Sequence, residues 1–274
     1  MMHQGQSRDQ VEEVGILLIA VKNLAEQHLH HYGPLEEMDM LTMMDMVKTE
    51  PGQFVSSREE ISTYLLEVEA AKYREICSQY KYMRKIRGDG NCFYRALCFG
   101  HLESLLQNDR ALQRFKETVK QSGRELLAAG FDESSFKDML DMFVGVLEQC
   151  EADEQGDALL QLFNEQTTSD SMVQYLRLLT SAYLQNHADF FSHFVEAPSL
   201  KVYCTREVET MAMECDHVDI LALSEALGVS IHIASVEGGD GHRLAHHTIP
   251  EGAEPCLHLL YKTAHYDILY PHCH

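Results

Sequence analysis

The stretch that decides the fold reads Arg87-Gly88-Asp89-Gly90-Asn91-Cys92-Phe93-Tyr94-Arg95-Ala96-Leu97. Its two glycines allow a sharp turn and a close approach of the backbone to a ligand. A helix is expected to follow Asn91 and to continue through Leu106, which places Cys92 in its first turn. The positive end of the helix dipole favours a thiolate there. The stretch predicts a cysteine nucleophile; the simpler alternative is an ordinary turn with Cys92 packed as a small apolar side chain.

The backbone of this turn adds a second chemical feature. The first N–H groups of a helix have no intrahelical partner. Those of Asp89, Gly90, Asn91 and Cys92 are expected to point at the place where an acyl carbonyl would be attacked. Preorganised N–H donors of this kind bind the oxyanion of a tetrahedral intermediate. These four backbone groups are therefore the candidate oxyanion hole.

A thiol nucleophile needs a base, and the chain contains 16 histidines, so position rather than presence identifies a candidate. His265 stands where a strand is expected to begin. Residues two apart on a strand share a face, about 6.5–7 Å apart at Cα. Asp267 is therefore placed to orient the His265 imidazole, as the third member of a Cys/His/Asn system does, while Tyr266 and Ile268 face the core. Alternatively, His265 and Asp267 are polar surface residues on an edge strand.

The rest of the chain predicts helices first and strands afterwards. Ser56 resembles a helix cap, and Asp216 and Gly228 are expected to begin and end another helix. The expected helices are 56–80, 92–106, 112–121, 135–150, 158–164, 171–185, 187–195 and 217–227; the expected strands are 229–233, 257–261 and 266–270, the last two joined by a hairpin at 262–265. This order predicts an α+β fold with helices packed around a small, mainly antiparallel sheet.

The first 53 residues differ in character from the remainder. Apolar residues at helical spacing predict an amphipathic helix over about 11–31, and Gly33-Pro34 ends it. Residues 34–53 are rich in methionine and acidic residues and are typical of a linker. We therefore divide the chain into an N-terminal extension, 1–53, and a catalytic domain, 54–274. The extension either docks a partner or packs and frays without a function of its own.

Composition excludes several classes of protein. The 22 Lys and Arg against 43 Asp and Glu give a net charge of −21, which is unfavourable for binding nucleic acid or an anionic membrane. The eight cysteines form no C-x-x-C pair, and no secretory signal precedes them. We expect a cytoplasmic protein with reduced thiols. The histidine-rich stretches are interpreted as solvated surface, so neither a metal nor a cofactor is expected.

Taken together, the two candidate segments resemble the otubain group of OTU-type deubiquitinating cysteine proteases. Asp89 to Arg95 is similar to the family's nucleophile motif, and His265 to Tyr270 is similar to its C-terminal histidine motif. Four interior stretches also resemble otubains, and these are 163–170, 175–180, 207–209 and 215–217. The resemblance covers about residues 54–274 and implies an OTU or papain-like cysteine protease domain.

Within the group, the stretches 126–131 and 260–263 are more similar to otubain two than to otubain one. Asp267 departs from this pattern, because otubain two carries asparagine there and otubain one carries aspartate. An ionised aspartate favours imidazolium more strongly than asparagine does. We therefore expect the Cys92–His265 pair to be biased toward thiolate and imidazolium.

The resemblance implies a role for each residue. Cys92 is the nucleophile, His265 is the base and then the acid, Asp267 orients His265, and Asp89 belongs to the loop that forms the oxyanion hole. The implied substrate is an isopeptide bond of ubiquitin or polyubiquitin, and ubiquitin-conjugating enzymes are further candidate partners; the expected locations are the cytoplasm and the nucleus. Two alternatives stay open: a ubiquitin- or conjugating-enzyme-binding module without catalysis, and another acyl-transfer cysteine enzyme.

Overall fold

The computed structural model describes residues 53–61, 68–153, 155–238 and 241–272. The helix predicted over 11–31 and the linker after it, up to residue 52, lie outside the described residues. The division of the chain at 53/54 stays a prediction.

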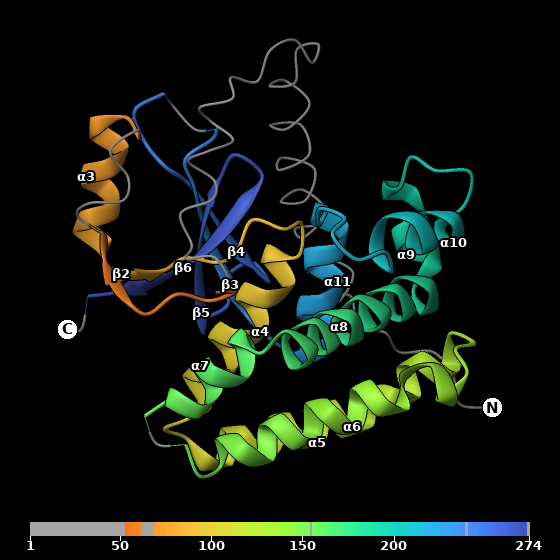
Figure 1. Cartoon of the computed structure of the whole chain (residues 1–274). Helices are drawn as coiled ribbons and strands as arrows, with labels where there is room; N and C mark the ends of the chain where they lie inside the picture. The colour runs from red at the N-terminus through yellow and green to blue at the C-terminus, as the bar shows by residue number, and fades with distance from the viewer. Residues whose placement is uncertain (1–52, 62–67, 154, 239–240, 273–274) are drawn as a thin grey trace.

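All helices of the described chain precede its last four strands, in the order seen in Figure 1. Several begin or end where local signals predict, most clearly the helix that Asp216 caps and Gly228 ends in a left-handed conformation. Their bounds are α3 Ala70–Gln79, α4 Cys92–Leu105, α5 Asp109–Ala128, α6 Glu133–Cys150, α7 Asp157–Asn164, α8 Gln166–Asn186, α9 Ala188–Phe191, α10 Leu200–Tyr203 and α11 His217–Leu227. A 3₁₀ turn, Ser192–Phe194, follows α9, and a π-helix, Cys204–Val208, follows α10.

The strands form one six-stranded sheet in the order β1-β2-β6-β5-β3-β4. Their bounds are β1 Glu59–Glu60, β2 Tyr80–Arg84, β3 Ile231–Ser235, β4 Ala245–Ile249, β5 Leu257–Lys262 and β6 His265–Pro271. Four of these five pairings are antiparallel, and the pairing of β3 with β5 is parallel. The predicted fold class, an α+β domain around a mainly antiparallel sheet, is confirmed.

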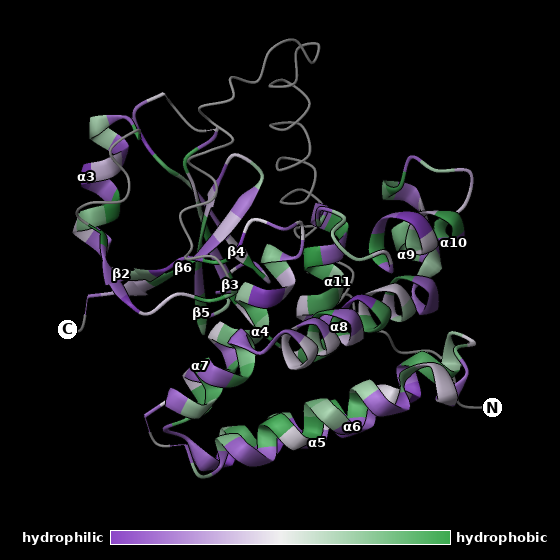
Figure 2. Ribbon diagram, in the orientation of Figure 1, coloured by the Kyte–Doolittle hydropathy of each residue, from purple (hydrophilic) through white to green (hydrophobic). Residues whose placement is uncertain are grey.

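Two apolar cores lie on opposite faces of the sheet. The larger core joins β5 and β6 to α4, which lies between the sheet and α8, with the α5–α6 hairpin beyond (Figure 1). The smaller core includes Ile76 of α3 and Met83, Leu260 and Leu269 of the sheet. Hydrophobic and hydrophilic residues mix along α3 and α5, as expected of helices with one solvent-facing side (Figure 2). The α4 helix is thereby enclosed, and its N-terminus is held rigidly beside β6.

A two-residue turn positions the start of β6. Tyr261 pairs with Tyr266 and Lys262 with His265, so the predicted hairpin is confirmed. Thr263 and Ala264 adopt φ of 50° and 57°, the left-handed conformation that two-residue hairpins favour and that non-glycine residues rarely adopt. The turn places His265 at the first position of its strand. Strain concentrated beside a candidate site is a common feature of functional regions.

The helix predicted from Ser56 is wrong in its first part. The Ser56 hydroxyl accepts a hydrogen bond from the Lys85 N–H (2.8 Å) instead of capping a helix. Glu59 and Glu60 pair with β2 as strand β1, and α3 begins only at Ala70. The same hydroxyl and acidic residues satisfy a helix cap or a strand edge equally well, so the outcome depends on a partner strand distant in sequence. The sequence prediction also omitted β2 and β4.

Candidate active site

Cys92 is the first residue of α4, as predicted, and its exposed fraction is 7%. The preceding turn depends on Gly90, which has a φ of +79°. A Cβ atom at this position would lie 2.0 Å from the carbonyl oxygen of Ala212, so only glycine fits. The loop that carries Ala212 therefore packs directly against the nucleophile turn.

His265 and Asp267 lie together as the strand spacing predicts. His265 Nε2 lies 3.0 Å from Asp267 Oδ1, and the same oxygen accepts the backbone N–H of Ile86 at 2.8 Å. Asp267 has an exposed fraction of 6%, so its orientation is fixed by burial as well as by these contacts. The alternative of two polar surface residues on an edge strand does not describe this pair, because β6 lies between β2 and β5.

The His265 imidazole is strongly biased toward its protonated form. Burial opposes protonation, but the charge of Asp267 and its hydrogen bond, followed by the neighbouring Cys92, raise the pKa of His265 to about 11. Tyr266 faces the opposite side of the strand and packs edge-on against Phe93 of α4, with ring centroids 5.3 Å apart. Strand β6 thus anchors in the core through one face and presents the His265–Asp267 pair through the other.

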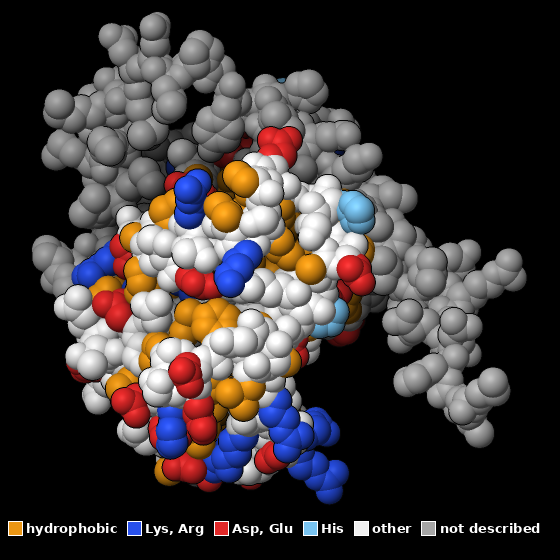
Figure 3. Space-filling view, turned by 90° about the vertical axis from the view of Figure 1, so that its right-hand side faces the viewer, with side chains coloured by type: hydrophobic (Ala, Val, Ile, Leu, Met, Phe, Trp, Pro, Cys, Tyr) orange, Lys and Arg blue, Asp and Glu red, His pale blue; other side chains and the backbone are white. Residues whose placement is uncertain are grey.

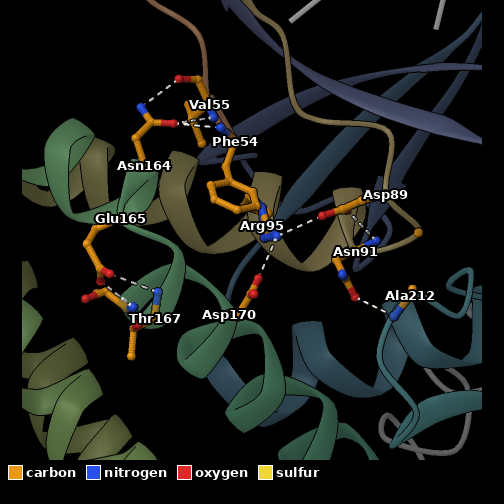
Figure 4. A network of polar contacts seen from close by, with 12 residues as sticks. Phe54, Val55, Asp89, Asn91, Arg95, Asn164, Glu165, Thr167, Asp170 and Ala212 are labelled. Atoms are coloured by element: carbon orange, nitrogen blue, oxygen red, sulfur yellow. Dashed lines mark hydrogen bonds and ion pairs between the residues drawn. The ribbon is translucent and has the colours of Figure 1, made fainter. Parts of the chain in front are cut away.

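Asp89 shapes the nucleophile turn and does not contact the histidine. Its carboxylate accepts the Asn91 N–H (3.0 Å) and pairs with the buried guanidinium of Arg95 (3.1 Å). Arg95 also pairs with Asp170 of α8 at 3.2 Å, and it lies over the ring of Phe54 (Figure 4). The role that Asp89 can fill is therefore to position the turn, whereas Asp267 orients the imidazole.

The candidate oxyanion hole is smaller than expected. In this conformation the Asp89 N–H donates to the Arg87 carbonyl oxygen (3.1 Å), and the Asn91 N–H is taken by the Asp89 carboxylate. The N–H groups of Gly90 and Cys92 donate to no other described residue. Of the four backbone N–H groups expected to bind the oxyanion, only those of Gly90 and Cys92 are therefore available in this conformation.

A pocket of about 710 Å³ opens beside Cys92. Gly90, Cys92 and Tyr266 line one side. The other side is formed by the segment 194–217, which we call the pocket wall and which lines the pocket at 194–198, 202–203, 206–207 and 214–217. Four acidic residues face this pocket, namely Glu196, Glu207, Glu214 and Asp216. The segment contains the π-helix Cys204–Val208, a geometry that is frequent at functional sites. The pocket can take an extended, positively charged peptide segment up to the thiol.

The sequence did not identify the residues whose hydrogen bonds and ion pairs support this site. Asn164 accepts the N–H groups of Phe54 and Val55 (Figure 4). Two residues of α8 also support the site: Asp170 pairs with Arg95 of α4, and Arg177 donates to the Gly90 carbonyl oxygen in the nucleophile turn. Arg177 carries a weak signal, since it stands within the apolar run Tyr175-Leu176-Arg177-Leu178-Leu179 that predicts a buried position.

Metal ligation and membrane insertion find no support in the described part of the chain. No group of three His, Cys, Asp or Glu among these residues has the arrangement of a metal site. None of the described helices combines the length and apolar character needed to span a membrane.

Comparison with known proteins gives consistent matches. The family model of the peptidase C65 otubains matches residues 47–271. The chain is 50% identical over 200 residues to the ubiquitin thioesterase OTUB2 of Mus musculus, covering 73% of this chain and 85% of that protein. It is 44% identical over 223 residues to the ubiquitin thioesterase OTUB1 of Homo sapiens, covering 79% and 82%. A solved complex of ceOTUB1 with ubiquitin aldehyde and UBC13~Ub matches at 28% identity with a TM-score of 0.76, covering 86% of this chain and 100% of that one.

Proposed function

Because the chain belongs to the peptidase C65 otubain family, and shares more identity with otubain two than with otubain one, we propose that Cys92, His265 and Asp267 form the catalytic triad of a deubiquitinase. The protein is a cysteine-type deubiquitinase of the OTU class, as the family and its named relatives establish. The reaction is hydrolysis of the isopeptide bond between a ubiquitin C-terminus and a lysine side chain. The arrangement of His265 between Asp267 and Cys92 is the single observation that supports this assignment of roles best.

The acylation step uses the thiolate and the imidazolium together. The Cys92 sulfur attacks the carbonyl carbon of the isopeptide bond, and a carbon–sulfur bond forms while the carbonyl oxygen takes the negative charge. The free N–H groups of Gly90 and Cys92 are the donors available to that oxyanion. The His265 imidazolium then gives its proton to the lysine amine, which leaves as the carbon–nitrogen bond breaks. A thioester between Cys92 and ubiquitin remains.

Deacylation returns the enzyme to its starting state. The neutral His265 imidazole takes a proton from a water molecule, whose oxygen attacks the thioester carbonyl. The carbon–sulfur bond breaks and the thiolate and imidazolium are restored. Ubiquitin leaves with a free C-terminal carboxyl group, which gives its proton to solvent. Throughout both steps Asp267 orients the imidazole, because the Ile86 N–H and the His265 ring both donate to its Oδ1 atom.

The acidic residues of the pocket give a part of the chain's negative charge a role in substrate binding. A ubiquitin tail that bears arginines is attracted by the carboxylates of Glu196, Glu207, Glu214 and Asp216. The acidity is not spread evenly over the protein. Figure 3 shows Lys and Arg side chains gathered at the lower edge of one face, where the α5–α6 hairpin lies. The pocket beside Cys92 is therefore one of the places where acidic side chains gather, and it attracts positively charged peptide segments.

A covalent probe tests the assignment of the nucleophile. A ubiquitin carrying a C-terminal electrophile should form one adduct with the wild-type protein, and mass spectrometry of the digest should place it on Cys92. The Cys92→Ala variant should form none, although Cys215 lines the same pocket. An adduct on Cys215 in the wild-type protein would contradict the assignment.

Partners and location extend this proposal. The ceOTUB1 complex contains ubiquitin aldehyde and UBC13~Ub, and we propose ubiquitin, polyubiquitin and ubiquitin-conjugating enzymes as partners of this chain. A binding module without catalysis is the less favoured function, because the base and its orienting carboxylate are arranged beside the thiol. We also propose the cytoplasm and the nucleus as its locations, since all seven cysteines in the described part of the chain are free thiols.

A further inference from the structure

Arg177 of α8 is a fully buried cation immediately behind the nucleophile turn. Its exposed fraction is 0%, and its guanidinium lies over the ring of Tyr94 at 4.4 Å. Arg95 is equally buried but is paired with the carboxylates of Asp89 and Asp170. Arg177 has no carboxylate within 4 Å among the described residues, and neutral oxygens accept all of its hydrogen bonds. Burying a charge without an ion pair is costly, so such an arginine calls for an explanation.

One side of the guanidinium holds the nucleophile turn. Its Nη2 atom donates to the Gly90 carbonyl oxygen (3.1 Å) and to Asn91 Oδ1 (2.8 Å), and Nε also donates to Asn91 Oδ1 (3.2 Å). In a trans peptide the carbonyl and the following N–H point in opposite directions. Because Arg177 holds the Gly90 carbonyl and Asp89 holds the Asn91 N–H, the peptide between residues 90 and 91 is fixed at both ends.

The remaining hydrogen bonds of the guanidinium hold residues 208–213, a part of the pocket wall that does not itself line the pocket. Nη1 donates to the Val208 carbonyl oxygen (3.0 Å), and Nη2 donates to the Met213 carbonyl oxygen (2.7 Å). Ala212 closes the network by donating its N–H to Asn91 Oδ1 at 2.9 Å (Figure 4). The residues between 208 and 213 thus connect through one side chain to the turn that carries Cys92.

The geometry points to Arg177 as a positioning residue for the reaction, one that holds the Gly90 carbonyl inward and ties the pocket wall to the oxyanion donors. A rotated peptide at Gly90–Asn91 would turn the Gly90 carbonyl oxygen toward the Asp89 carboxylate, which now accepts the Asn91 N–H, and would displace the adjoining peptides that carry the two oxyanion donors, the N–H groups of Gly90 and Cys92. The planar fork of arginine reaches four backbone and side-chain oxygens at once, which a lysine ammonium on the same stem cannot do. This inference rests on the proposed function only for its kinetic consequence, since the network itself is independent of the substrate.

The variant Arg177→Lys tests this role, with Ser181→Ala as the matched control. Ser181 is also buried on α8 and donates to the Glu209 carboxylate (2.6 Å) of the pocket wall, but it does not contact the nucleophile turn. Diubiquitin hydrolysis is measured per active site, with sites counted by reaction with a ubiquitin C-terminal electrophile. We expect Arg177→Lys to lower kcat about 100-fold, the effect of losing an oxyanion donor, with KM within about twofold of the wild type. Ser181→Ala should keep kcat within about twofold of the wild type.

Hydrogen exchange supplies a readout that does not require activity. Arg177→Lys should speed amide exchange in both 88–94 and 208–214, whereas Ser181→Ala should speed it only in the wall. An unchanged kcat per site, or exchange that rises in the wall alone, would overturn the proposal for Arg177. If the wild-type protein cleaves no diubiquitin, the proposed function fails, and hydrogen exchange still decides whether Arg177 ties the two segments together.

A second variant covers the case in which Arg177→Lys does not fold. Asn91→Ala removes the oxygen that accepts three N–H groups and leaves the arginine in place. It should lower kcat per site at least about 10-fold and speed exchange in both segments. Unchanged values for both measurements would overturn the proposal.

Discussion

Replacing Asp267 by asparagine should separate the charge of the triad from its geometry. Asp267 Oδ1 accepts both the His265 ring and the Ile86 N–H. The asparagine oxygen can accept the same two bonds, so the variant removes mainly the negative charge. The expected result is that the bias of His265 toward imidazolium becomes weaker while its position is kept.

The size of the effect follows from the environment of His265. Burial opposes protonation of the ring, and its pKa nevertheless rises from 6.5 to about 11. At 1.36 kcal/mol per pH unit, this rise corresponds to roughly 6 kcal/mol in favour of imidazolium. Asp267 supplies the two largest favourable contributions, its charge first and its hydrogen bond second. If removal of the charge eliminates about half of the total, the pKa of His265 should fall by about two units.

The assay is alkylation of Cys92 by iodoacetamide as a function of pH, followed by mass spectrometry of the peptide that contains it. Thiolate, not thiol, reacts, and an imidazolium neighbour stabilises the thiolate. In Asp267→Asn the imidazolium is less favoured, so less Cys92 should be paired as thiolate and its alkylation at neutral pH should be slower than in the wild type. Cys92→Ala provides the background from the other thiols. An equal or larger thiolate fraction in Asp267→Asn at neutral pH would refute this reasoning.

Three further substitutions test other parts of the site. Asp219 of α11 accepts the hydroxyl of Tyr203, which lines the pocket, and burial raises the pKa of Asp219 to about 7. Its stabilising contribution is therefore present below its unfolded pKa and is lost as pH rises through about 7. Chemical denaturation between pH 4 and 8 should show Asp219→Asn gaining stability relative to the wild type by at most about 4 kcal/mol as pH rises, and a pH-independent difference would contradict this. Ala264→Gly should raise the free energy of unfolding by about 1 kcal/mol, because glycine adopts a φ of 57° without strain, and a loss of stability would argue against strain in the hairpin. Gly90→Ala should abolish diubiquitin cleavage, since its Cβ would overlap the Ala212 carbonyl; retained activity would show that the two loops are not in contact in the working enzyme.

The positions of Cys92, His265 and Asp267 in their elements could be predicted from the sequence because their signals are local. A glycine-flanked cysteine before an apolar run predicts a helix with Cys92 in its first turn, and α4 begins at that residue. Period-two alternation places His265 and Asp267 on one face of a strand, and their side chains meet at 3.0 Å. Each inference needs only a few consecutive residues and the geometry of one element.

The supporting structure could not be predicted because it depends on distant partners. Ser56 resembles a helix cap until Lys85, which follows strand β2, is known to lie beside it. Nothing near Arg177 in sequence indicates that it reaches Gly90, which is far away in the chain and close in space. The number of oxyanion donors changed for the same reason, since the Asp89 side chain folds back on its own turn.

Cleavage of a panel of linkage-defined diubiquitins by the wild-type protein and by Cys92→Ala tests the central claim most directly. The wild-type protein is expected to convert at least one linkage to monoubiquitin, and Cys92→Ala is expected to convert none. Absence of cleavage of every linkage by the wild-type protein, or equal cleavage by Cys92→Ala, would contradict it.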